Sequence, residues 1–140
     1  MQVGSLPSVG GCQCGTVRFT VTESPLIVYV CHCRKCRKQS ASAFGISVIV
    51  PRAALRVTHG MPAHWFCPGD SGRIYDGAFC PTCGTRLWHA GDGNATISIK
   101  GGALDEPPGL ENAVHIWISR KLPGVIIPDE ARQFAEEPDE

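Results

Sequence analysis

Eight cysteines, most of them in short clusters, are the feature that most constrains how this chain can fold. The clusters are Cys12-Gln13-Cys14, Cys31-His32-Cys33-Arg34-Lys35-Cys36 and Cys80-Pro81-Thr82-Cys83, with Cys67 standing alone. Large aromatic side chains are few, with three tryptophans, two tyrosines and five phenylalanines. Because so thin a core is combined with 16 glycines and 11 prolines, we expect cysteine chemistry to supply extra crosslinks.

The first residues carry no basic segment followed by an apolar one, as a secretory signal would. The longest apolar runs, 26–30 and 46–50, are too short to span a bilayer. We therefore expect a cytoplasmic protein with no membrane partner and with reduced thiols. In that compartment, clustered cysteines indicate metal sites before disulfides.

A chain of 140 residues fits one globular domain, and its 43% hydrophobic and 19% charged content excludes a disordered chain or a long coiled coil. We assign that domain to residues 10–128, with an N-terminal extension at 1–9 and an acidic tail at 129–140, expected to be solvated or frayed. The formal net charge is zero, but residues 1–128 carry 12 bases and 7 acids. This mild charge favours small anionic ligands and argues against nucleic acid as a partner.

Short alternating or apolar segments at regular spacing predict an all-β fold. We expect strands at 17–21, 26–29, 44–50, 55–58, 64–67, 73–79, 86–89, 96–100 and 114–119. Short helical turns are expected at 34–40 and 51–54. The three tryptophans, Trp65, Trp88 and Trp117, are expected in the core.

Two cysteine pairs together make one complete zinc site. A closed structural zinc site takes four ligands, commonly two from each of two short loops. The segment from Cys80 to Gly84 has the form of a zinc knuckle, and glycines also flank the first pair. We therefore predict a structural zinc held by Cys12, Cys14, Cys80 and Cys83, which joins the first strand to a distant hairpin.

The remaining triplet, Cys31, Cys33 and Cys36, offers three thiolates to a second zinc and leaves a fourth position open. An open position distinguishes catalytic zinc from structural zinc, because water or a substrate thiol can be activated there. One alternative is a redox pair formed by Cys33 and Cys36. Another is a closed shell, completed by Cys67 or by a histidine, namely His32, His59, His64, His89 or His115.

Four basic residues, Arg34, Lys35, Arg37 and Lys38, surround Cys36. Cations offset the negative charge of clustered thiolates and lower the pKa of a thiol. They also bind carboxylates, so they are candidates for holding a substrate. The alternative interpretation is an ordinary solvated turn.

These motifs resemble the family of glutathione-dependent formaldehyde-activating enzymes, which includes the centromere protein V type. The resemblance extends through 113–121 and covers residues from about 10 to about 134. It implies an Mss4-like all-β fold of antiparallel sheets stabilised by zinc, with two Zn²⁺ per chain. In that pattern Cys12, Cys14, Cys80 and Cys83 fall at the structural zinc, and Cys31, Cys33 and Cys36 fall at the catalytic zinc.

The resemblance also implies a reaction. It is the addition of the glutathione thiol to formaldehyde, which gives S-hydroxymethylglutathione and belongs to the carbon–sulfur lyase class. Glutathione would be the thiol substrate, and the four basic residues around Cys36 would hold its carboxylates. The alternatives are a non-catalytic zinc-stabilised binding module or chaperone-like partner platform, and a zinc-storage or redox-sensing protein. A homodimer stays open, and Cys67 has no assigned role.

Overall fold

The computed structural model describes residues 6–69 and 72–138, and within them the chain forms two sheets. The smaller sheet has the strand order β1-β2-β5 and comprises β1 (Ser8–Gly11), β2 (Arg18–Val21) and β5 (Leu55–His59). The larger has the order β10-β3-β4-β9-β8-β7-β6. Its strands are β3 (Ile27–Cys31), β4 (Gly45–Pro51), β6 (Ala63–Pro68), β7 (Ile74–Phe79), β8 (Arg86–Gly91), β9 (Thr96–Lys100) and β10 (Val114–Ile116).

The core lies between these two sheets, and alternation along the strands builds it. In β2, Phe19 and Val21 are buried while their neighbours are half-buried. Phe19 meets Trp88 of β8 edge to face, with ring centroids 5.5 Å apart. Small branched side chains fill the remaining space, mainly Val28, Val30, Val48, Val50, Ile97 and Ile99. A valine-rich core of this kind suits the pleated surface of packed sheets.

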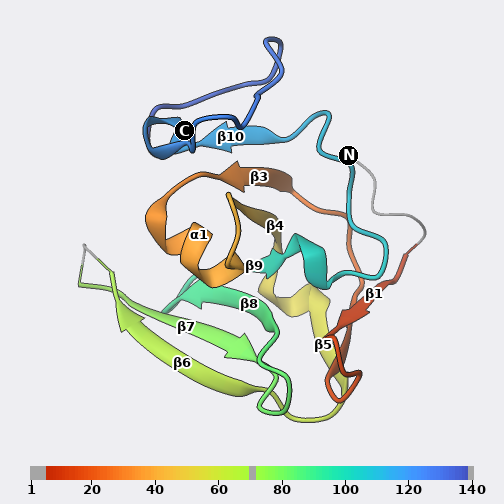
Figure 1. Cartoon of the computed structure of the whole chain (residues 1–140). Coiled ribbons are helices and arrows are strands. Elements are labelled where there is room, and N and C mark those ends of the chain that lie inside the picture. The colour runs from red at the N-terminus through yellow and green to blue at the C-terminus, as the bar shows by residue number, and fades with distance from the viewer. Residues whose placement is uncertain (1–5, 70–71, 139–140) are drawn as a thin grey trace.

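The other face of the large sheet carries α1 (Arg34–Ser40), which lies against β4 (Figure 1). The helix begins after Cys33, whose sulfur accepts the backbone N–H of Cys36, and it ends at Ala41 in the left-handed conformation. Close approach to the sheet requires Gly45. A Cβ built at Gly45 would lie 3.1 Å from the Cβ of Cys36.

The predicted all-β architecture is confirmed, with the expected helical turn at 34–40 found as α1 and that at 51–54 found as a 3₁₀ turn at Arg52–Ala54. Two further 3₁₀ turns, Gly101–Ala103 and Ile118–Arg120, were not expected. Strand β1 was also missed, and it begins at Ser8, inside the predicted extension. The sheets are antiparallel except where β10 runs parallel to β3. Of the three tryptophans expected in the core, Trp88 is buried, while Trp65 and Trp117 are half-buried.

The acidic tail is not frayed over its described part, because it lies along β10. The backbone N–H of His115 donates to the backbone carbonyl of Arg132, and the N–H of Phe134 donates back to the carbonyl of His115, each at 2.9 Å. The phenyl ring of Phe134 packs on the small cluster of Cys31, Val114 and Ile116. An exposed strand edge gains hydrogen bonds when another segment covers it, and the tail covers β10 in this way.

Within the described ranges, 6–69 and 72–138, we find no helix of the length and apolar character needed to cross a membrane.

Candidate metal centres

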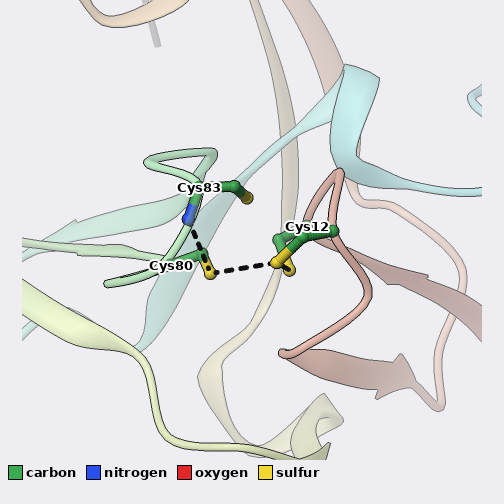
Figure 2. Close-up of side chains that lie close together, drawn as sticks. Cys12, Cys80 and Cys83 are labelled. Atoms are coloured by element: carbon green, nitrogen blue, oxygen red, sulfur yellow. Dashed lines mark hydrogen bonds between the residues drawn. The ribbon is translucent and has the colours of Figure 1, made fainter.

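Four cysteines from two distant loops converge on one point. Figure 2 shows three of them, Cys12, Cys80 and Cys83. Cys12 and Cys14 follow β1, and Cys80 and Cys83 lie in the turn between β7 and β8. All four sulfur atoms lie within 4.8 Å of one another. The sulfur of Cys14 is 3.6 Å from that of Cys12 and 3.8 Å from that of Cys80. This is the set grouped above by counting ligands.

Backbone and hydroxyl donors surround these sulfur atoms. The N–H of Val17 donates to Cys12 at 3.2 Å, and the N–H groups of Thr82 and Cys83 donate to Cys80 at 3.3 and 3.4 Å. The Thr85 hydroxyl, 3.2 Å from the sulfur of Cys83, lowers the pKa of that thiol to about 5. Donors that face sulfur stabilise thiolates, the form in which cysteine binds zinc. The four-sulfur cluster therefore fits a tetrahedral Zn²⁺.

The second cluster is local to one segment of chain. Cys31 ends β3, Cys33 caps α1, and Cys36 lies in its first turn. Their sulfur atoms also lie within 4.8 Å of one another.

In this three-sulfur cluster the charge is unequally shared. Hydrogen bonds from Cys31 and Cys36 lower the pKa of Cys33 to about 2, and the same interaction with Cys33 raises the pKa of Cys31. Three adjacent sulfurs thus hold one negative charge easily and resist a second. A divalent soft cation removes that repulsion, so the donor set fits a zinc with three thiolate ligands.

In the described part of the chain, none of the residues considered above for closing this shell has a ligand atom within 4.8 Å of all three sulfurs. No further cysteine, histidine or carboxylate joins the three-sulfur group in the part of the chain that the structure describes. His32 is fully buried and faces His115, with Nε2 3.0 Å from Nδ1. His64 pairs with Asp76 at 2.8 Å, and His59 is exposed on the smaller sheet. Cys67 belongs to β6, and its sulfur contacts the carbonyl of Pro68.

The basic run is distributed around α1. Arg34, Lys35 and Lys38 are exposed, while Arg37 is half-buried and donates to the carbonyl of Arg120 at 3.4 Å. A shallow depression of about 550 Å³ lies on this side of the helix. It is lined by Arg34, Arg37, Lys38, Ala41, Ser42 and Leu122. Three of the four basic residues proposed to hold a substrate therefore share one concave surface, and Lys35 does not line it.

Sequence reasoning missed Lys100 and considered His89 only as a metal ligand. The Lys100 ammonium donates to Nδ1 of His89 at 2.9 Å and to the side-chain oxygen of Gln39 in α1. Burial lowers the pKa of Lys100 to about 8 and that of His89 to about 3. Negative charge on Cys36, Cys31 and Cys33 acts in the opposite direction and raises the pKa of Lys100. The available signal was the polar alternation of Thr96, Ser98 and Lys100 within a strand.

Comparison with known proteins agrees with this arrangement. A crystal structure of a Rhodobacter sphaeroides protein is similar with a TM-score of 0.60 at 22% identity, covering 76% of this chain and 98% of that one. This similarity shows the fold. The family model described as glutathione-dependent formaldehyde-activating enzyme matches residues 7–120, a span that contains both cysteine clusters. The chain therefore belongs to the family of glutathione-dependent formaldehyde-activating enzymes.

Proposed function

We propose that this protein adds the thiol of glutathione, or of a related thiol, to formaldehyde or another small aldehyde. In this addition the sulfur forms a bond to the carbonyl carbon, the π electron pair of the carbonyl moves to oxygen, and the thiol proton ends on that oxygen. The product is a hemithioacetal, which is an S-hydroxymethyl compound when the aldehyde is formaldehyde. The reverse reaction breaks the carbon–sulfur bond and is a carbon–sulfur lyase reaction.

The observation that carries this proposal is the difference between the two cysteine clusters. Four sulfurs meet in one and only three in the other, with no further ligand joining the three in the described part of the chain. A zinc held by Cys31, Cys33 and Cys36 would accept one more ligand and would favour the thiolate form of a thiol bound there. Cys12, Cys14, Cys80 and Cys83 would hold the structural zinc.

The chain's own residues supply binding and orientation. Arg34, Arg37 and Lys38 line the depression beside the helix that carries Cys36, where guanidinium and ammonium groups can bind carboxylates. Lys35 lies on the same helix and is exposed. We propose that these four residues hold the thiol substrate. We also propose that the protein is cytoplasmic.

The proposal is tested by measuring zinc per chain and adduct formation together. Two zincs per chain are expected, and carbon-13 NMR of labelled formaldehyde mixed with glutathione should show faster adduct formation than the spontaneous reaction. A preparation that holds two zincs and gives no acceleration would contradict the proposal. One tightly held zinc that ignores glutathione would favour the non-catalytic binding module.

Two matched variants separate the roles of the clusters. Cys36→Ser removes one ligand of the three-sulfur cluster and should abolish acceleration while the thermal unfolding midpoint stays close to that of the wild type. Cys83→Ser opens the four-sulfur cluster and should unfold the domain, because structural zinc supplies folding free energy. Equal unfolding by both substitutions would argue against a catalytic role for the three-sulfur cluster.

A further inference from the structure

One face of the large sheet carries a row of polar side chains beside the three-sulfur cluster. Strand register places Trp65 opposite Gly77, Gly77 opposite His89, and His89 opposite Ser98. Paired residues share a face, and so do residues two apart on one strand. Lys100 therefore joins this row, which we call the polar face and define as Trp65, His89, Ser98 and Lys100.

The polar face lies on the same side of the sheet as the three-sulfur cluster. Lys100 pairs with Ser47, Ser47 pairs with Tyr29, and Cys31 lies two residues beyond Tyr29 on the same strand. Helix α1 contacts this side as well, because Gln39 accepts a hydrogen bond from Lys100.

Two donors of the polar face are buried without a partner. Ser98 is only 7% exposed, and neither its Oγ nor Nε1 of Trp65 has a hydrogen-bond partner. An unsatisfied buried polar group costs about 1–3 kcal/mol. The indole lies over Gly77, where an added Cβ would fall 2.2 Å from Nε1, so the ring nitrogen is held on the strand next to His89.

The charge of the polar face is positive. Lys100 is bonded to two neutral acceptors, and the guanidinium of Arg86 stacks on Trp65, 5.1 Å from the ring centroid, where it repels Lys100. No aspartate or glutamate stands at the positions of this face in the described strands. Strand β7 carries one carboxylate, that of Asp76. It is adjacent to Gly77 and therefore lies on the opposite face of the sheet, where it pairs with His64.

We propose that the polar face is a carboxylate-binding subsite of the three-sulfur centre. Lys100 Nζ, Ser98 Oγ and Trp65 Nε1 supply the hydrogen bonds, and His89 orients the ammonium. A carboxylate accepts up to about four hydrogen bonds, so it satisfies the orphan donors and pairs with the Lys100 ammonium at once. Identification of this carboxylate with that of a reactant rests on the proposed function. It belongs either to the thiol or to an aldehyde that is itself a carboxylic acid.

The test uses the zinc-loaded protein and the indole N–H signal of Trp65 in nitrogen-15 NMR, assigned by its loss in Trp65→Phe. Acetate is the probe, acetamide is its neutral counterpart, and sodium chloride holds the ionic strength constant. Acetate should shift the signal in a saturable manner, and acetamide should not. An unmoved signal, or equal shifts from both compounds, would overturn the proposal.

Variants show whether the named donors are responsible. Lys100→Met should weaken the acetate effect at least about tenfold, because a charge-assisted hydrogen bond is lost. Ser98→Ala should weaken it by a smaller factor. The control is Arg56→Met, which removes one positive charge from the exposed strand β5. Unchanged acetate binding in Lys100→Met, or equal weakening in Arg56→Met, would refute the assignment.

Two further pairs of probes distinguish the source of the carboxylate. If it belongs to the thiol, glutathione should saturate the Trp65 shift and cysteamine, which has no carboxylate, should not. If it belongs to the aldehyde, glyoxylate should act and formaldehyde should not. If acetate shifts the Trp65 signal but glutathione and glyoxylate both leave it unmoved, the link to a reactant is overturned. This readout needs no turnover, so the two claims fail separately. Adduct formation with an unmoved Trp65 signal would refute the subsite alone. A saturable Trp65 shift without adduct formation would refute the proposed function alone.

Discussion

Substitution of Gly45 by alanine tests whether close contact between α1 and the sheet holds the three-sulfur cluster together. A Cβ at this position would lie 3.1 Å from the Cβ of Cys36 and 3.4 Å from its carbonyl oxygen. Carbon atoms in contact prefer about 3.5–4.0 Å, so the deficit is roughly half an ångström. The obstructing atoms belong to the start of a helix and cannot rotate away, so α1 itself must move.

The cost of that movement falls on the three-sulfur cluster, the proposed site of the second zinc. Overpacking of this kind costs about 1–3 kcal/mol. Gly45 is also the cross-strand partner of Cys31, so a shift of α1 separates the sulfurs of Cys31 and Cys36. If the whole cost appears in metal binding, the second zinc binds about 5- to 150-fold more weakly, since each 1.4 kcal/mol is a factor of ten.

The assay is competition for zinc with a chromophoric chelator, combined with urea unfolding. Gly45→Ala should weaken one of two zincs and leave the other unchanged. Gly102→Ala is the control, because a Cβ there meets nothing within 4 Å. Equal zinc affinities in both variants and the wild type would refute the reasoning that this contact holds the cluster.

Two further predictions concern the core and the polar face. Phe19→Ala should lower the free energy of unfolding by about 3–5 kcal/mol in urea titrations, because the ring is fully buried against Trp88 and its removal leaves a cavity; a loss below 1 kcal/mol would contradict this packing. His89, with a pKa near 3 when folded and an ordinary value of 6.5 when unfolded, takes up its proton mainly in the unfolded state, so stability falls as pH drops through that interval. His89→Asn should reduce the slope of the free energy of unfolding against pH, between pH 6 and pH 4, by up to about 1.4 kcal/mol per pH unit. Parallel stability curves for the variant and the wild type would rule out this linkage.

Some features were predictable because they depend on local pattern. Alternation in the segment that became β2 reports burial directly, and ligand counting grouped the cysteines as the structure places them. Strand β1 escaped detection because Val9, the only large apolar residue of Ser8–Gly11, is exposed, so no apolar alternation marks the strand. The packing of the acidic tail depends on Phe134 and on the open edge of β10, which only the tertiary fold reveals.

The polar face was also beyond sequence reasoning, for a different physical reason. Trp65, His89 and Lys100 lie on three strands, and register alone brings them together. Polar residues that alternate with apolar ones along a strand usually mark the face of an antiparallel sheet that faces water. Here α1 covers part of that face, which turns the same alternation into a buried set of donors.

The two cysteine clusters differ in what their loss does to the chain. Cys14 and Cys80 are 66 residues apart, and a crosslink over such a loop removes much conformational entropy from the unfolded state. Cys31 to Cys36 spans a single strand end and one helical turn, so a metal there closes almost no loop. Stability is therefore expected to depend on the four-sulfur cluster. We therefore expect the three-sulfur cluster to exchange a ligand while the sheets persist, and this freedom is what the proposed reacting centre requires.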